Sequence, residues 1–554
     1  MTPNRLSLFP LALLLALPLR AQTNAPDPLR FEDVTASAGL APALTNWELG
    51  HAAAWGDANG DGRLDLFFGS FADRKVNFSS NAPIPNMLWL ASTGGFVRSE
   101  QPLLEMRGLG NRISASVFAD LDNDGDLDLI LGHHVQELSD DPDRAKPAGI
   151  PHGGYSTMFE NTGAGIFKRV PDSGPWPPRI GARNVAPVDL DRDGRLDLLI
   201  GDGSYESKTN NHLLVYRNLG GFRFEDITEK AGLPLSNMTS LGLALGDVND
   251  DGLPDFFAAS CNRLFLGTAG GGFREAAFKP LERVYRNRKD RNGFFCGAAF
   301  GDLNGDGRLD LVVTLHSLPA RIHVLINEAA GSGDPLFVDR TAELGLDARF
   351  PTYLTNGAAM KSAHVEVRDM DNDGRLDIVL AAYVKNEAGL FQPLVLRNLG
   401  PGTNSLPRFP ELPLERMAGY CAPGPVSDYD GDGRLDIFLP SWFRPGLVPT
   451  LLLRNVTPGG HYLAVRVRDA KGRRNPMGIG AVARAYRAGG AGDPARFIQR
   501  GDLVTGFGYA CGQEAAVHLG LGAETNCDLV VSWEGQSKVW KNVAADQVFD
   551  AVFE

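Results

Sequence analysis

The chain has little of what several common protein classes need. It has only five cysteines in 554 residues, so a disulfide framework does not hold the fold together. A bridge between Cys511 and Cys527 and free buried thiols are both compatible with this spacing. Acidic residues outnumber basic ones, and the formal net charge of −13 argues against nucleic acid as a partner. No GxSxG, HExxH, phosphate loop or Cys/His metal spacing occurs, so no motif favours an enzyme.

Long hydrophobic runs are missing after the first residues. Residues 1–21 contain Arg5, the apolar stretch SLFPLALLLALPL from Ser7 to Leu19, and Ala21 before a polar segment. We expect a cleavable secretory signal, because the stretch is too short to anchor a chain stably; a buried N-terminal helix is the alternative. No later stretch reaches the roughly 18 apolar residues of a membrane-spanning helix. The sequence therefore predicts a chain without a membrane span that is secreted, either periplasmic or extracellular.

One acidic nine-residue pattern, D-x-[DN]-x-D-G-x-x-D, occurs seven times. We name these segments loops 1 to 7: DANGDGRLD at 57–65, DLDNDGDLD at 120–128, DLDRDGRLD at 189–197, DVNDDGLPD at 247–255, DLNGDGRLD at 302–310, DMDNDGRLD at 369–377 and DYDGDGRLD at 428–436. Ordinary Asp- and Gly-rich surface turns are the alternative. Each residue type has a usage of only about 5 to 7%, so chance does not account for seven matches.

The pattern has the chemistry of a calcium loop. Oxygen ligands at positions 1, 3 and 5, with a glycine at position 6 for a sharp turn, surround a hard cation that prefers six to eight oxygens. An EF-hand has its last ligand, a Glu, at position 12. Here position 12 is apolar in all seven copies, and the closing carboxylate is the Asp at position 9. We expect side-chain ligands from positions 1, 3, 5 and 9 and a backbone carbonyl from position 7.

This assignment predicts up to seven structural Ca²⁺ ions. Seven divalent cations would bring the formal charge of −13 close to neutrality, so the acidity belongs to the metal loops. The predicted metal residues, loop by loop, are Asp57, Asn59, Asp61, Arg63, Asp65; Asp120, Asp122, Asp124, Asp126, Asp128; Asp189, Asp191, Asp193, Arg195, Asp197; Asp247, Asn249, Asp251, Leu253, Asp255; Asp302, Asn304, Asp306, Arg308, Asp310; Asp369, Asp371, Asp373, Arg375, Asp377; and Asp428, Asp430, Asp432, Arg434, Asp436.

The residues around the loops predict an all-β fold. Position 9 is followed by apolar runs such as LFFG at Leu66 and LLIG at Leu198, which suit buried strands. Each loop therefore joins two strands, and a second pattern between loops, a strand ending in Asn and then an aromatic strand, adds two more. Four-stranded units repeated seven times predict a seven-bladed β-propeller. The segment Phe31–Thr35 duplicates a fourth-strand pattern and is expected to complete the last blade, which lacks one.

The last part of the chain has a different pattern. From about His461 the segments HYLAVRVRDAKGRRNPMGIGAVARAY and CDLVVSWEGQSKVW alternate apolar residues without an acidic loop, which is typical of a β-rich, sandwich-like domain. We therefore expect a signal peptide over 1–21, the propeller over 29–458 and a small C-terminal β domain over 460–554.

These segments resemble a known family. The small-residue strands GHAAAWGD at Gly50, GLALGDVN at Gly242 and GAAFGDLN at Gly297 resemble the FG-GAP or VCBS repeats of integrin α-subunit-type propellers. The segments NPMGIGAVARAY, GFGYACGQEAAVHLGLG and VVSW resemble the ASPIC/UnbV domain of the cartilage acidic protein-like family. That family usually has Ser-Gln in place of Cys511 and Gly512, and Pro-Ser-Gly in place of Glu534, Gly535 and Gln536. The resemblance implies calcium-stabilised adhesion or interaction, without an established catalytic activity.

A ligand is expected on the propeller face opposite the metal loops, where cationic and aromatic residues converge. An extracellular protein or an acidic glycan is the expected partner. The alternative function is an extracytoplasmic hydrolase or lyase acting on acidic polysaccharide at that face, and an ordinary polar rim is the alternative without function. The residues expected there are His51, Arg112, His133, His134, Arg183, Asp202, Tyr205, Arg263, His316, Lys361, Tyr383, Lys385, Tyr420, Trp442 and Arg444.

Overall fold

The computed structural model describes most of the chain. The described residues are 28–41, 44, 50–71, 85–105, 113–133, 156–171, 182–202, 213–235, 238, 240–281, 295–315, 321–330, 333–348, 350, 363–402, 404–442 and 449–554. The predicted signal peptide lies outside them, as do six residues expected on the ligand face: Arg112, His134, Tyr205, His316, Lys361 and Arg444.

Seven sheets of the described chain each contain one metal loop. We number them sheets 1 to 7 after their loops. The first three consist of β2 (Gly50–Gly56), β3 (Asp65–Ser70), β4 (Met87–Ser92) and β5 (Gly95–Ser99); β6 (Ile113–Ala119), β7 (Asp128–His133), β8 (Thr157–Asn161) and β9 (Phe167–Arg169); and β10 (Ala182–Val188), β11 (Asp197–Asp202), β12 (Leu213–Asn218) and β13 (Phe224–Asp226). The short helix α1 (Pro102–Glu105) follows sheet 1.

Sheets 4 to 7 follow the same plan with small variations. In sheet 6 the fourth strand, β25, pairs with β23 instead of with β24. The strands are β14 (Leu243–Gly246), β15 (Asp255–Ala258), β16 (Arg263–Thr268) and β17 (Gly272–Glu275); β18 (Phe295–Gly301), β19 (Asp310–Leu315), β20 (Ile322–Asn327) and β21 (Phe337–Asp339); β22 (Val365–Arg368), β23 (Asp377–Lys385), β24 (Phe391–Leu396) and β25 (Met417–Tyr420), the last preceded by the 3₁₀ turn Leu414–Arg416; and β26 (Val426–Ser427), β27 (Asp436–Leu439) and β28 (Leu451–Asn455) with β1 (Phe31–Asp33).

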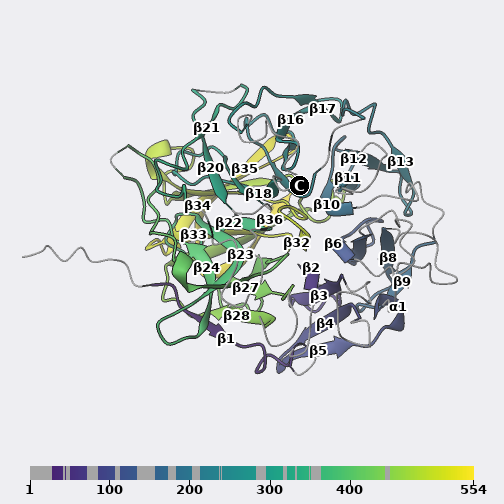
Figure 1. The fold of residues 1–554 in the computed structure, drawn as a ribbon. Coiled ribbons are helices and arrows are strands. Elements are labelled where there is room, and N and C mark those ends of the chain that lie inside the picture. The colour runs from purple at the N-terminus through teal and green to yellow at the C-terminus, as the bar shows by residue number, and fades with distance from the viewer. Residues whose placement is uncertain are drawn as a thin grey trace, which may run out of the picture.

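The sheets lie around a common centre. In Figure 1, β2, β6, β10, β18 and β22 surround the middle of the molecule, whereas β5, β9, β13, β17 and β21 lie toward its rim. Each loop connects the innermost strand to the next antiparallel strand, as the pairs Gly56 with Asp65 and Ala119 with Asp128 show. The predicted all-β, propeller-like fold is therefore confirmed, and its loops join strand to strand as expected.

The N-terminal strand belongs to the last sheet. β1 pairs antiparallel with β28, with Phe31 opposite Asn455 and Asp33 opposite Leu453. This strand pair is the one that the sequence predicts for the seventh unit. It joins residues more than 400 positions apart and covers the edge of β28.

Small residues at the ends of the inner strands let neighbouring sheets pack closely. A Cβ on Gly56 would lie 2.8 Å from Cδ2 of Phe118 in sheet 2, and a Cβ on Gly301 would lie 2.5 Å from Cγ1 of Val367 in sheet 6. Both glycines directly precede a loop. The Gly-Asp pairs in the sequence are therefore explained by contact with the next sheet.

The C-terminal region, residues 460–554, forms two further sheets. They contain β33, β29 and β36 in one, and β31, β30, β34 and β35 in the other. The bounds are β29 (His461–Asp469), β30 (Val482–Arg487), β31 (Phe497–Asp502), β33 (Val517–Gly522), β34 (Asn526–Trp533), β35 (Gln536–Ala544) and β36 (Gln547–Phe553), with a 3₁₀ turn at Pro494–Arg496. One hydrophobic core joins these strands to sheets 2 and 3, so the core crosses the boundary expected near residue 460.

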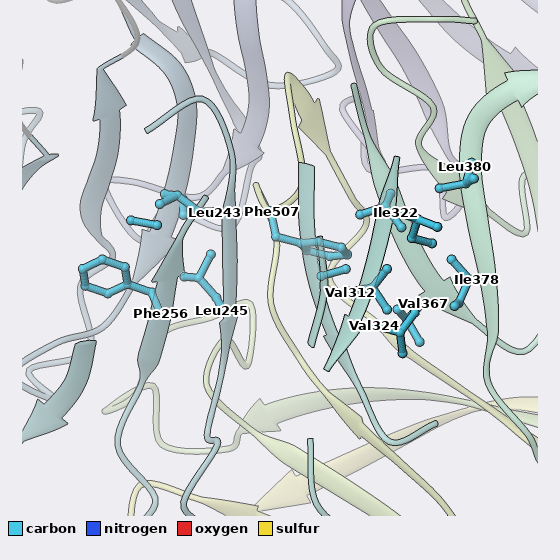
Figure 2. Packing of buried hydrophobic residues seen from close by; sticks show 14 of the residues in the cluster. Leu243, Leu245, Phe256, Val312, Ile322, Val324, Val367, Ile378, Leu380 and Phe507 are labelled. Carbon is cyan, nitrogen blue, oxygen red and sulfur yellow. The ribbon is translucent and has the colours of Figure 1, made fainter. Parts of the chain in front are cut away.

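A segment of the C-terminal region enters the centre of the molecule. The short strand β32 (Cys511–Gly512) pairs in parallel with β2, and Gly508 forms an antiparallel bridge with Leu243. Phe507 belongs to the core of sheets 3 to 6, and Figure 2 shows it between Leu243 and Leu245 on one side and Val312 and Ile322 on the other. We call residues 503–513 the central segment.

Candidate metal sites and the central segment

The loops share one backbone geometry. The glycine at position 6 has a positive φ in every loop, for example 86° at Gly62 and 99° at Gly125, a conformation that glycine adopts without strain. Its N–H donates to the carboxylate at position 1 in all seven loops, as from Gly62 to Asp57 at 2.8 Å. The glycine thus turns the chain back so that position 1 faces the later ligands.

The aspartate at position 9 is the most buried acidic residue of each loop. Asp65, Asp255, Asp310, Asp377 and Asp436 have no exposed surface, and Asp128 and Asp197 are 1% exposed. One carboxylate oxygen of this aspartate accepts a hydrogen bond from the backbone N–H of position 2 in the same loop. The other oxygen accepts from a backbone N–H in the third strand of the same sheet or directly after that strand. In loop 2 the donors are Leu121 at 2.9 Å and Asn161 at 2.9 Å. Position 9 is therefore fixed before any metal binds.

Carboxylates converge in four of the loops. The acids at positions 1, 3 and 9 offer oxygens within 4.8 Å of one another in loops 2, 3, 6 and 7. Burial raises the pKa of Asp120 to about 6 and that of Asp128 to about 8; the other loop aspartates add to both increases, and backbone N–H groups oppose them. Without a cation, bringing these carboxylates together as anions costs free energy.

Two buried oxygens at position 1 of the loops have no internal partner. Oδ1 of Asp120 and Oδ1 of Asp189 are buried and form no hydrogen bond with the described residues. A buried carboxylate oxygen without a donor is destabilising unless it binds a cation. The oxygen-only donor set, the tight turn and these two atoms all fit Ca²⁺. The loops would hold the ion through positions 1, 3, 5 and 9.

The loops differ at positions 3 and 7. Position 3 is Asn in loops 1, 4 and 5, whereas in loops 3 and 6 it is an Asp paired with a neighbouring arginine, Arg217 with Asp191 and Arg397 with Asp371. The arginine at position 7 pairs with the Asp at position 5 of its own loop in loops 1, 3, 5, 6 and 7. These side chains neutralise part of the acidic charge. The predicted ligand at position 7, the carbonyl, stays a prediction.

An asparagine at the end of the third strand connects neighbouring sheets. Nδ2 of Asn218 donates to the carbonyl of Leu121 in loop 2 at 2.8 Å and to that of Leu196 in its own loop at 3.1 Å. The equivalent contact between sheets recurs from Asn161, Asn327, Asn398 and Asn455 to Ala58, Val248, Leu303 and Met370. Sheets 1 and 4 have Ala91 and Gly267 instead. The recurring Asn was visible in the sequence, but its role was not.

The expected ligand face is only partly described, and its described residues are mostly buried. His51, His133, Arg183, Tyr383 and Tyr420 are each less than 10% exposed. Among the others, Arg263 pairs with Glu275, the Lys385 ammonium lies over the Phe391 ring, and Trp442 lies beside His51. The structure does not describe the side chain of Asp202. The described residues thus do not form an open cationic surface.

Tyr509 of the central segment binds two of these residues. Its hydroxyl lies 2.9 Å from Nε2 of His51 and accepts a hydrogen bond from Nη1 of Arg183 at 3.1 Å. Its backbone N–H donates to Nδ1 of His364 at 2.9 Å. The side chain is 3% exposed. His51 and Arg183, which the sequence suggests as ligand contacts, therefore hold the chain's own C-terminal region in place.

The C-terminal region also contacts the metal loops directly. Arg500, whose side chain is 1% exposed, donates to the carbonyls of Asp247 in loop 4 at 2.6 Å and Gly307 in loop 5 at 3.0 Å. It also binds Asp250 and Asp502 at 2.8 Å each. Gln499 donates to Oδ2 of Asp369 in loop 6 at 2.9 Å. The face that carries the loops is thus occupied by this region, which the sequence did not indicate.

Two family models match the chain. The FG-GAP-like repeat matches residues 57–131, 302–380 and 369–439, which include five of the loops, and the ASPIC and UnbV model matches residues 471–551. The chain belongs to the family of FG-GAP-repeat proteins with a C-terminal ASPIC/UnbV domain. The expected resemblance is therefore confirmed.

The chain is similar to cartilage acidic protein 1 at low sequence identity. Cartilage acidic protein 1 of Homo sapiens is 25% identical over 383 residues, which are 66% of this chain and 52% of that protein, and that of Xenopus tropicalis is 24% identical over 387 residues, 67% and 54%. The chain thus spans about half the length of the curated relatives it matches.

Two solved structures that resemble the chain are distant in sequence. The periplasmic gluconolactonase of Pseudomonas aeruginosa is 15% identical with a TM-score of 0.33, covering 65% of this chain and 88% of that one. The fucose-specific lectin from Aleuria aurantia is 9% identical with a TM-score of 0.28, covering 66% and 95%.

The structure describes the two sites at which the sequence is expected to depart from the ASPIC/UnbV pattern. Cys511 pairs with Ala53 across β32 and β2, where a small buried residue fits. Oε2 of Glu534 lies 3.1 Å from Nε of Arg474.

All five cysteines are free thiols, so the bridge between Cys511 and Cys527 does not form. Among the described residues, no helix has the length and apolar character needed to cross a membrane.

Proposed function

We propose that this FG-GAP and ASPIC/UnbV protein is a secreted calcium-binding β-propeller that acts as a binding or adhesion module. Up to seven structural Ca²⁺ ions bind in loops 1 to 7. The observation that carries the proposal is the convergence of buried carboxylates at positions 1, 3 and 9, with Oδ1 of Asp120 and Oδ1 of Asp189 lacking hydrogen-bond donors. The partner is an extracellular protein or a glycan.

Calcium stabilises the folded chain in this proposal. The ion offsets repulsion among carboxylates and links the end of the first strand to the start of the second. A site that is filled at about 100 times its Kd contributes roughly 2.7 kcal/mol to folding. Extracellular modules bind calcium weakly, with Kd values of about 10⁻⁴ to 10⁻³ M, so the effect depends on millimolar calcium.

The experiment measures calcium content and thermal stability together. The mature chain is dialysed against calcium, its metal content is determined by elemental analysis, and melting is followed by circular dichroism with calcium, with EGTA and with EGTA followed by excess calcium. We expect several bound Ca²⁺ per chain, a lower Tm in EGTA and recovery on readdition. Magnesium serves as the control ion because it demands a tighter octahedral shell. A metal-free chain with the same Tm in all buffers would refute the proposal.

The enzyme alternative finds no support in the described residues. Its suggested Arg and His groups on the face opposite the loops include Arg183 and His51, both of which are less than 10% exposed and bind Tyr509. A catalytic acid or base has to reach its substrate within hydrogen-bond distance. We therefore put forward the binding module alone. Pull-down of glycans and extracellular proteins with the calcium-loaded chain identifies its partner.

A further inference from the structure

A cleft lies between the ASPIC/UnbV domain and two metal loops. Its volume is about 610 Å³. Arg484, Tyr486 and Phe497 of the ASPIC/UnbV domain line one side, and Asp250 of loop 4 with residues 305–308 of loop 5 line the other. Clefts of this size at the boundary between domains are frequent sites for small ligands. The cleft exists only while the ASPIC/UnbV domain is docked on the loops.

The ASPIC/UnbV side of the cleft is aromatic. The rings of Tyr486 and Phe497 meet edge to face, with centroids 5.7 Å apart. Tyr486 is 9% exposed, and within the described chain its hydroxyl forms no hydrogen bond. This hydroxyl is therefore available to hydrogen-bond with a ligand group, and such a bond adds affinity. The wall thus combines an apolar surface with one available polar atom.

The loop side of the cleft is polar but balanced in charge. Nη2 of Arg484 lies 2.5 Å from Oδ1 of Asp250, and the guanidinium of Arg308 pairs with the carboxylate of Asp306 in loop 5. Each of these charged groups already has a partner of opposite sign. A charged ligand would have to displace one partner and leave it unpaired, which is costly. An uncharged ligand can use the remaining donors and acceptors of both pairs.

We infer that this cleft binds an uncharged saccharide. A sugar hydroxyl both donates and accepts hydrogen bonds, which suits adjacent guanidinium, carboxylate and phenol groups. The C–H face of the sugar ring suits the apolar wall formed by Tyr486 and Phe497. This inference rests on the proposed binding function and narrows its glycan partner to neutral sugars. It also locates the site beside the loops, whereas the sequence suggests an acidic ligand on the opposite face.

The test is a binding titration on the calcium-loaded full chain. The probes are neutral disaccharides with glucose, galactose, mannose, fucose or N-acetylglucosamine units, with digalacturonate as the acidic counterpart and an uncharged tetrapeptide as the alternative class. We expect at least one neutral disaccharide to bind and digalacturonate not to compete. Phe497→Ala should raise Kd about tenfold or more, and Tyr486→Phe about fivefold. Tyr486→Phe should leave Tm unchanged, because the hydroxyl has no internal partner.

Phe549→Ala is the matched control, since Phe549 is a half-buried phenylalanine of the same domain that packs on Trp540, away from the residues lining the cleft. It should leave Kd unchanged. Binding of digalacturonate or the tetrapeptide alone, equal Kd values for Tyr486→Phe and wild type, or no binding of any neutral disaccharide would each overturn the inference. Calcium content and Tm are measured on the same samples. A calcium-loaded, stabilised chain that binds no sugar refutes the cleft assignment and leaves the calcium proposal intact.

Discussion

The side-chain amide of Asn218 donates to the backbone carbonyl of Leu121, 2.8 Å away in the neighbouring sheet. Both groups are buried, and the same amide also satisfies the carbonyl of Leu196. One side chain thus joins the third strand of one sheet to two metal loops. Five asparagines make this contact between sheets in the described chain.

Asn218→Ala should destabilise the protein by about 2 to 3 kcal/mol, because it leaves two buried carbonyls without donors. The loss is measured as the change in unfolding free energy in urea at saturating calcium. The control is Asn404→Ala, since Asn404 is exposed, and it should change stability by less than about 0.5 kcal/mol. Equal stability of the two variants would show that the contact contributes nothing.

Asp128→Asn should remove one Ca²⁺ from the chain. The amide keeps an oxygen acceptor for one of the two backbone donors but loses the negative charge that the ion needs. Elemental analysis should show one calcium fewer per chain, and the difference in Tm between wild type and variant should largely disappear in EGTA. Asp528→Asn changes an equally buried carboxylate that accepts backbone N–H groups outside the loops, so its calcium content should match wild type. Unchanged calcium in Asp128→Asn would contradict the assigned ligand.

Tyr509→Phe should loosen the central segment. It removes the oxygen that binds Arg183 and His51, at an expected cost of about 1 to 3 kcal/mol. Urea unfolding measures that cost, and hydrogen exchange of the backbone amides in residues 503–513 measures the local effect. Tyr462→Phe is the control, because within the described residues the Tyr462 hydroxyl has no hydrogen bond and its ring stacks on His518. Equal exchange in the two variants would show that the hydroxyl does not hold the segment.

Arg500→Leu should weaken the docking of the ASPIC/UnbV domain by about 3 to 5 kcal/mol, since Asp502 and two loop carbonyls lose their buried partner. Limited proteolysis should then cut the chain between residues 455 and 461 faster than in wild type. Arg487→Leu removes an exposed pair with Glu524 and should be cut at the wild-type rate. A proteolysis rate for Arg500→Leu that equals the control would refute the role of Arg500 in docking.

Glu366 should make stability depend on pH in acid. Burial alone would raise its pKa, but Arg368 on the same strand and His364 directly before that strand outweigh burial and lower the pKa below its ordinary value. From other elements, Gln513 and the Val426 N–H donate to the same carboxylate, and the uncharged thiol of Cys511 lies nearby. Because the folded pKa lies below the unfolded value of about 4.3, the contribution is complete above that pH and is lost as the pH falls through the folded pKa.

Wild type should therefore lose more unfolding free energy than Glu366→Gln between about pH 5 and pH 3. Other carboxylates titrate alike in both proteins, so the difference between the two curves isolates Glu366. Parallel curves over this range would contradict the prediction.

The local structure was predictable because it is encoded by neighbouring residues. The Asp-Gly spacing of Asp120 to Asp128 defines a loop between two strands, and the apolar run after it defines a buried strand. The repeated pattern at Phe31 even identified the partner strand of β28. The contacts of the central segment were not predictable in this way, because Tyr509 and His51 are separated by 458 positions and neither belongs to a repeat.

The same limit applies to two residues expected on the ligand face. Arg183 and His51 lie at one end of inner strands, as the sequence predicts, but their partner comes from the ASPIC/UnbV domain. The charge and aromatic character of residues in a sequence cannot distinguish a side chain that binds a ligand from one that binds another part of the same chain. The recurring asparagine, for example Asn218, is a second case. In the sequence, an Asn at the end of a strand indicates a turn, and its contact with the neighbouring sheet is seen only in the folded structure.

The pairing of β1 with β28 has a consequence for biosynthesis. A ribosome has to add more than 400 residues after Phe31 before its partner Asn455 exists, and the central segment follows later still. Contacts this distant in sequence form slowly, and β1, which is synthesised first, can meanwhile pair with another chain. Nascent chains that stop before residue 513 should therefore lack the segment that joins the inner strands and should associate with one another.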